Sequence, residues 1–399
     1  MTQSGLLEII NNGENSGVEF KLDDIHPNEL VKEIVAFANF EGGMILLGVD
    51  DTGKIQGIRR EKIEEWIMNI CRENIVPGII PYFEKIRFDD GKVVAIIKIS
   101  KGENKPYQTN KGQFFIRVGS TKRLATKEEL SRLFQAGQTL HYDLTLIYHT
   151  SIADLDMRKV KDYFLKFREL NIDEYSNQLI EKLLINTEIM VESGGEKVIT
   201  LAGMLLFGKN PQQYLFQSGI TAAVFKGTQL DYEAYDKREL SGSLIDLENE
   251  LGEILESGII DQAIKFVMQN TRVSSTLKGN KRVDKPDYPR QSIREAIVNA
   301  VAHRDYSIIG SRIRLFIFED RIEIKSPGKL PNTVTIEKMK EGCSFARNST
   351  IVRFLQNYGY MEKFGLGIPM KIIKMMREYT GKEPELKESG EEFSLTLYK

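Results

Sequence analysis

The spacing of hydrophobic and polar positions divides the chain into amphipathic helices and short strands. Apolar residues recur at helical spacing after Pro27, at residues 61–71 and at residues 244–268, and each pattern predicts a helix. Compact apolar runs at residues 44–49 and 93–99 predict strands. Helices and strands are mixed along the chain, with no obvious repeat, so the pattern predicts an α+β protein with several domains.

The clearest helical pattern occupies residues 294–306. Glu295 and Asn299 are four residues apart, so they share one helical face beside an apolar side. Such a pair suits a nucleotide site, because an amide oxygen can hold Mg²⁺ and a carboxylate can orient a water molecule. Taken alone, the pattern also fits an amphipathic helix whose polar residues are merely solvated.

Downstream motifs favour the nucleotide interpretation. Residues 312–324 have the pattern of a β-hairpin, and Gly365 and Gly367 precede a further helix, where backbone N–H groups can approach a phosphate. In this order the segments resemble the divergent GHKL-type (Bergerat) ATP-binding domain at the C-terminal end of many bacterial Schlafen/AlbA-type proteins. The resemblance covers about residues 286–399. It implies an α/β sandwich that binds ATP, with Mg²⁺ held at Asn299.

One departure from the GHKL pattern concerns recognition of the base. GHKL ATPases carry an Asp whose carboxylate accepts a hydrogen bond from the adenine amino group, and here the corresponding segment is Ser326-Pro327-Gly328. A serine hydroxyl is a weaker acceptor than a carboxylate. The alternative is a degenerate Bergerat fold that serves as a scaffold or a dimer interface. The candidate nucleotide-binding residues are Glu295, Asn299, Ser326, Gly328, Gly365 and Gly367.

A second group of candidate residues lies near the start of the chain. Glu19 and Lys21 fall in a predicted strand and would point to the same side. Glu14 precedes this strand, and Asp50 and Asp51 follow the 44–49 strand. Metal-dependent phosphodiesterases have this layout: carboxylates bind Mg²⁺ or Mn²⁺, and a lysine stabilises developing charge. From spacing alone, the alternative is an exposed strand with a Glu–Lys pair, followed by an Asp-rich turn.

Three segments of this region resemble the Schlafen AlbA-type domain, over about residues 10–137. The resemblance implies nucleic-acid binding. Some Schlafen relatives cleave tRNA or rRNA with two glutamates and one aspartate, which match Glu14, Glu19 and either Asp50 or Asp51 in this chain. The implied metal ligands are Glu14, Glu19 and Asp50. The matching segments are residues 14–21, 36–53 and 115–121.

A run of basic residues with interspersed aromatic residues follows in the same region. Its cations could track a phosphate backbone while Tyr107 stacks on a base. The alternative is a solvated hairpin edge. The candidate nucleic-acid contacts are Lys105, Tyr107, Arg117, Lys122 and Arg123.

Composition limits the classes of protein that fit. The net charge of −2 requires any nucleic-acid partner to be bound by a local patch. Cys71 and Cys343 form no metal or redox motif, which fits a reducing cytoplasm. We expect no signal peptide and no membrane segment. With 399 residues, and a linker at 278–281, we expect three domains. They are a Schlafen AlbA-type domain at 1–138, a mixed helical middle segment at 139–285 and a Bergerat-like domain at 286–399.

The first hypothesis is therefore a metal-dependent endonuclease, an RNase in preference to a DNase, that acts on tRNA, single-stranded RNA or DNA. ATP at the C-terminal domain would regulate it, with homo-oligomer formation as one route, and family resemblance implies phage defence as a role. The second hypothesis is a non-catalytic nucleic-acid-binding transcriptional regulator, whose GHKL-like domain senses a ligand or forms dimers.

Overall fold

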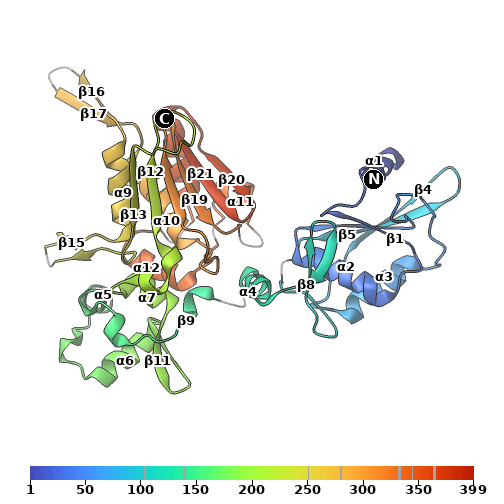
Figure 1. Cartoon of the computed structure of the whole chain (residues 1–399), viewed down its shortest axis with the longest axis horizontal. Helices are drawn as coiled ribbons and strands as arrows, with labels where there is room; N and C mark the ends of the chain where they lie inside the picture. The colour runs from blue at the N-terminus through green and yellow to red at the C-terminus, as the bar shows by residue number, and fades with distance from the viewer. Residues whose placement is uncertain are drawn as a thin grey trace. The chain divides into compact units, whose positions relative to one another are not determined.

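The computed structural model describes the whole chain except residues 103, 138–140, 250, 279–280, 331–333, 344 and 363–364. The chain forms two compact units, residues 1–140 and 141–399 (Figure 1). The first limit lies two residues beyond the expected limit at 138. The expected limit at 285 falls inside the second unit, so the middle and C-terminal segments pack together. No described helix is long and apolar enough to cross a membrane.

The first unit is built on a four-stranded sheet with the order β1-β2-β5-β4. β1 runs parallel to β2, and the other neighbours are antiparallel. A parallel pair needs a crossover connection, which α2 provides after its N-terminal Pro27. The sheet strands are β1 (Val18–Lys21), β2 (Gly42–Leu47), β4 (Tyr82–Arg87) and β5 (Val93–Ser100). The helices are α1 (Gln3–Asn11), α2 (Pro27–Asn39), α3 (Ile63–Asn74) and α4 (Lys127–Ala136).

The alternation of apolar residues along β2 and β5 gives this unit a core on each side of the sheet. Ile45 and Leu47 pack with α2 and α3, whereas Leu46 packs with Leu6 and Ile10 of α1. Two small strand pairs complete the unit, and β7 contacts α2. These strands are β3 (Ile75–Val76) with β6 (Gln108–Thr109), and β7 (Phe115–Val118) with β8 (Thr121–Leu124).

The second unit contains a six-stranded sheet with the order β13-β12-β18-β19-β21-β20. β12 belongs to the middle segment, yet it lies inside this sheet, parallel to β18. The helices α9 and α10 pack against the sheet and against each other. The strands are β12 (Ile220–Val224), β13 (Asp236–Leu240), β18 (Ile313–Ile317), β19 (Arg321–Pro327), β20 (Glu385–Ser389) and β21 (Glu392–Tyr398). The helices are α9 (Ile259–Asn270), α10 (Arg290–Ala302), α11 (Ile336–Lys340), α12 (Ser349–Asn357), the π-helical η5 (Gly367–Lys374) and α13 (Met375–Thr380).

The rest of the middle segment joins the C-terminal segment through a buried helix cap. The Asp143 carboxylate, fully buried, accepts hydrogen bonds from the backbone N–H groups of Thr350 (2.7 Å) and Ile351 (3.2 Å) at the start of α12. The strands of the middle segment are β9 (Leu146–Ile147), β10 (Met190–Ser193) and β11 (Glu196–Thr200). Its helices are η1 (Tyr142–Leu144), η2 (Ile152–Asp154), α5 (Met157–Arg168), η3 (Ile172–Glu174), α6 (Asn177–Asn186), α7 (Leu201–Phe207), α8 (Pro211–Tyr214) and η4 (Phe216–Ser218).

Two predicted elements are wrong. The helix expected at 244–268 is a strand pair, β14 (Leu247–Glu248) with β15 (Ile254–Glu256), followed by α9. The turn between these strands contains Gly252 at φ +76°, which a helix cannot accommodate. Of the linker expected at 278–281, Lys278 ends β16 (Val273–Lys278) and Lys281 begins β17 (Lys281–Pro286), which pair as a hairpin, while residues 279–280 lie outside the described part.

The helix expected at 294–306 exists but ends at Ala302. The Asn348 side-chain amide donates to the carbonyl oxygens of Ala302 (2.9 Å) and Arg304 (2.8 Å). It therefore takes up carbonyl groups that a longer helix would have used.

Candidate nucleotide pocket and nucleic-acid-binding residues

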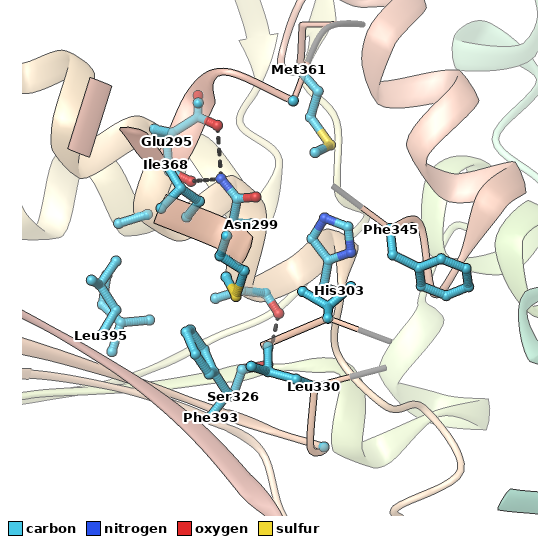
Figure 2. A pocket seen from close by; sticks show the side chains of 18 of the residues that line it. Glu295, Asn299, His303, Ser326, Leu330, Phe345, Met361, Ile368, Phe393 and Leu395 are labelled. Carbon is cyan, nitrogen blue, oxygen red and sulfur yellow. Dashed lines mark hydrogen bonds between the residues drawn. The ribbon is translucent and has the colours of Figure 1, made fainter. Parts of the chain in front are cut away.

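All six residues predicted to bind a nucleotide line one pocket of the second unit (Figure 2). They come from α10, from the end of β19 and from the start of η5. The pocket encloses about 1010 Å³ of empty space, open solvent included. Most of the other lining side chains are apolar, which is typical of a small-molecule site. They include Ile324, Met361, Ile368, Phe393 and Leu395.

Glu295 and Asn299 are joined to each other on the pocket side of α10. The Asn299 amide nitrogen donates to the Glu295 carbonyl oxygen (2.7 Å) and to its carboxylate (2.8 Å). The Asn299 oxygen therefore points away from Glu295 (Figure 2). Lys371 lies 3.7 Å from the Glu295 carboxylate and 2.7 Å from that of Glu362. The predicted shared face is confirmed, and it presents an acceptor oxygen to the pocket.

Gly367 begins η5 directly against the Glu295 carboxylate. A Cβ atom at this position would lie 1.8 Å from a Glu295 carboxylate oxygen, so no larger residue fits without movement. Gly365 also lines the pocket, although residues 363–364 of this glycine motif lie outside the described part. The absence of a side chain at Gly367 is therefore required by its contact with Glu295, and the approach of a phosphate to this backbone stays a prediction.

Ser326 and Gly328 close the sheet side of the pocket. The Ser326 hydroxyl donates to the Ala300 carbonyl oxygen at 2.8 Å, so its own oxygen is left as an acceptor (Figure 2). Gly328 has φ +118°, and a Cβ atom there would lie 2.6 Å from both Asp305 and Arg347. Those two side chains form an ion pair at 2.9 Å, which holds this turn in place.

The structure also brings together Glu14, Glu19 and Lys21 in the first unit, and we call these three residues the carboxylate cluster. Lys21 Nζ lies 2.5 Å from the Glu19 carboxylate and 3.9 Å from that of Glu14. Glu14 in turn accepts a hydrogen bond of 2.7 Å from the backbone N–H of Phe20. The prediction that Glu19 and Lys21 share one side of the strand is confirmed.

Arg117 turns this cluster into a buried ion network. Its side chain is fully buried and lies 2.9 Å from Glu19 and 3.4 Å from Glu33, while Lys122 lies 2.6 Å from Glu33. Burial raises the pKa of the Glu33 carboxyl above its ordinary value, and the hydrogen bond from Lys122 opposes that shift. Arg117 and Lys122 are therefore structural counter-charges, which corrects their expected place in an open basic surface.

The remaining candidate nucleic-acid contacts are also engaged within the unit. Lys105 is buried and donates to the Phe40 carbonyl oxygen at 2.7 Å, and Arg123 pairs with Glu129 at 2.6 Å. The Tyr107 side chain belongs to the core around α2, so in this structure its ring cannot stack on a base. Lys105 and Tyr107 are therefore not open to a nucleic acid in this structure.

Within the described part of the chain, no hydrogen bond or ion pair joins Asp50 or Asp51 to Glu14 or Glu19. The Asp50 carboxylate accepts hydrogen bonds from Thr52, Gln56 and the backbone N–H of Lys54, which hold its pKa well below the usual range. This geometry is that of an Asp-stabilised turn. Among the residues that the structure describes, no group of three or more His, Cys, Asp or Glu side chains could hold a metal ion.

Comparisons with known proteins agree with both resemblances. Residues 14–126 match the family model "Schlafen, AlbA_2", and residues 310–397 match "Putative ATP-dependent DNA helicase recG C-terminal". The chain has a Schlafen AlbA_2 domain and a RecG-type C-terminal domain. Residues 131–217 between them match a domain of unknown function, DUF8451. The search of curated proteins gave no match.

Two solved structures are similar to this chain. The DIP2311 protein of Corynebacterium diphtheriae is 19% identical, with a TM-score of 0.46, over 96% of this chain and 75% of that protein. The N-terminal domain of a RecG-related protein from Nitrosomonas europaea is 21% identical, with a TM-score of 0.26, over 32% of this chain and 94% of that domain. The two domain matches themselves suggest a function related to nucleic acids.

Glu33 escaped the sequence analysis, whereas for His303 the sequence favours a structural role, with a place near the nucleotide as the alternative. In the Schlafen AlbA_2 domain, Glu33 lies in an ordinary amphipathic helix pattern, which gives no sign that it is buried. Its burial depends on partners that are distant in the sequence. In the nucleotide pocket, His303 follows the end of α10 and points into the cavity (Figure 2). Burial, with Arg347 as a lesser cause, lowers the pKa of His303 to about 4, so its ring is neutral at neutral pH.

Proposed function

We propose that this protein binds nucleic acid and responds to an adenine nucleotide held in the pocket beside α10. One observation carries the nucleotide part of the proposal: six residues, chosen from three separate segments, all line the same cavity. Its mostly apolar wall and its few polar groups suit a base together with a phosphate chain.

Each polar group of the pocket has a distinct role in this proposal. The Ser326 oxygen accepts a hydrogen bond from the adenine amino group, because its own hydrogen is donated to Ala300. The Asn299 oxygen, which points away from Glu295, fits a ligand of Mg²⁺, and the ion would neutralise phosphate charge. The backbone at Gly365 and Gly367 lies where phosphates can approach. Glu295 orients a water molecule beside them.

In the first unit the contacts argue against metal-dependent cleavage. Both Glu19 oxygens are taken by cations, Lys21 on one and Arg117 on the other, and the Asp50 oxygens are committed to their own turn. Such a donor set does not fit a divalent metal ion, because the ion would have to displace a fully buried guanidinium. We therefore favour the non-catalytic form of the first unit over the metal-dependent endonuclease, and we derive no metal-dependent step here.

Two measurements on the full-length protein test the proposal. Calorimetric titration with ATP and Mg²⁺ should show binding that is lost or strongly weakened in Asn299→Ala. Incubation with tRNA and with DNA, in Mn²⁺ or in EDTA, should show binding without cleavage. Metal-dependent cleavage that disappears in Glu19→Gln would restore the endonuclease hypothesis. Absence of ATP binding in the unaltered protein would exclude the nucleotide role.

A further inference from the structure

A second pocket of the second unit lies where β12, β18 and α9 end. It encloses about 740 Å³ of empty space, open solvent included, and shares no lining residue with the nucleotide pocket. Its walls are formed by Phe225 after β12, Phe318 after β18 and Asn270 at the end of α9. None of the candidate residues discussed above belongs to it.

An unpartnered hydroxyl lines this pocket. Tyr288 is only 1% exposed, and its hydroxyl oxygen has no hydrogen-bond partner among the residues that the structure describes. Buried polar groups in native proteins are nearly always hydrogen-bonded to protein, water or a ligand. The hydroxyl therefore indicates that a polar atom from outside the chain reaches this pocket.

The charge at the pocket suits an anion. Lys226 and Arg272 line it and are exposed, and neither has an ion-pair partner within the described part of the chain. Lys399 also lines the pocket and pairs with Asp287 at 3.2 Å. Glu319 also lines the pocket, so the lining side chains comprise three cations and two anions.

The hairpin of β16 and β17 begins at this pocket and is strongly basic. Residues 272–286 contain five Lys or Arg residues and a single Asp, in a chain whose net charge is −2. The hairpin projects away from the six-stranded sheet (Figure 1). Its register runs from Val273 opposite Pro286 to Lys278 opposite Lys281. A two-stranded ribbon of this kind can enter the major groove of B-DNA, which is about 12 Å wide.

We propose that this pocket and hairpin form a duplex-DNA-binding surface, in which the hairpin enters the major groove and the pocket holds a backbone phosphate. Lys226 and Arg272 neutralise the phosphate, and the Tyr288 hydroxyl donates to a phosphate oxygen, directly or through one water molecule. Duplex RNA fits less well, because its major groove is too narrow for side chains to read. The inference rests on the proposed nucleic-acid-binding function and assigns it to the second unit.

The first test is fluorescence anisotropy of the full-length protein with labelled duplex DNA over a salt series. The variants Lys226→Glu/Arg272→Glu and Lys281→Glu/Arg282→Glu should each bind at least about tenfold more weakly, with a shallower salt dependence. The control Arg168→Glu/Lys182→Glu makes the same change in charge on α5 and α6, and should bind like the unaltered protein.

The second test separates the hydroxyl from the fold. Tyr288→Phe removes an unpaired buried group, so its thermal midpoint should be unchanged or higher, while its affinity for duplex DNA falls several-fold. Equal binding by all the charge variants and the unaltered protein would overturn the DNA surface and leave the proposed function standing. An unaltered protein that binds no nucleic acid would overturn both, whereas ATP titration reports on the nucleotide pocket independently.

Discussion

The nucleotide pocket and the carboxylate cluster of the first unit contain similar residues, but only the pocket leaves a polar group open to a ligand. Each centres on a buried glutamate, Glu295 or Glu19, with a polar partner close in the sequence. In the pocket the partner Asn299 leaves its oxygen directed at an open cavity. In the cluster Lys21 and Arg117 occupy both oxygens of Glu19. The difference teaches that a charged motif indicates a ligand site only where its charges are not already balanced by the protein.

The largest expected effect is a loss of stability when the carboxylate cluster loses its buried cation. Arg117→Met should destabilise the first unit by about 3–5 kcal/mol, because it leaves Glu19 and Glu33 buried without their guanidinium. Chemical unfolding followed by hydrogen exchange in residues 1–140 measures this loss. Arg123→Met on the neighbouring strand is the control, since its ion pair with Glu129 is more exposed and contributes little to stability. Similar losses in the two variants would contradict the structural role of Arg117.

The next effect is on the pocket. Gly367→Ala places a Cβ atom against the Glu295 carboxylate, so ATP affinity should fall about a hundredfold, near 2.8 kcal/mol. Calorimetry at fixed Mg²⁺ gives the affinity. Gly310→Ala serves as the control in the same unit, because no atom lies within 4 Å of a Cβ there. Unaltered ATP binding by Gly367→Ala would remove η5 from the site.

A smaller effect concerns pH. The pKa of His303 is lowered to about 4 in the folded protein, below the ordinary value of about 6.5. The buried neutral ring is therefore compatible with full stability at pH values above about 6.5. This stability is lost as the pH falls from about 6.5 to about 4, because the unfolded chain then binds a proton that the folded protein does not. Thermal melts across this range should show the unaltered protein losing about 1–3 kcal/mol more than His303→Asn. Parallel curves for the two proteins would contradict a buried neutral ring.

The smallest expected effect concerns recognition of the adenine base by Ser326. Ser326→Ala removes the acceptor oxygen and should weaken ATP binding by about 1 kcal/mol. Ser326→Asp offers a carboxylate in its place and should strengthen binding of ATP relative to GTP. Competition between the two nucleotides measures the selectivity. If both variants bind ATP and GTP as the unaltered protein does, Ser326 does not contact the base.

Local pattern predicted the pocket better than the cluster, for a physical reason. Glu295, Asn299 and Gly367 were found because helical spacing and backbone freedom are properties of neighbouring residues. The charge of Arg117 is balanced in part by Glu33, which is 84 residues away in the sequence. A count of cations along the chain could therefore not show that Arg117 is neutralised.

The same reason explains which elements were predicted. The helix expected after Pro27 follows from local spacing, and α2 begins at that residue. The position of β12 in the C-terminal sheet depends on pairing with a strand more than eighty residues later, which periodicity does not contain.

The parallel pairing of β12 with β18 has a consequence for how this protein can be divided. A fragment that starts near residue 286 would lack β12 and β13, and it would expose the backbone N–H and C=O groups of β18 as an open sheet edge. Such edges recruit strands from other molecules. The RecG-type match alone is therefore not a self-sufficient folding unit. Exchange of segments between relatives should be tolerated near residue 140 and should cause aggregation near residue 285.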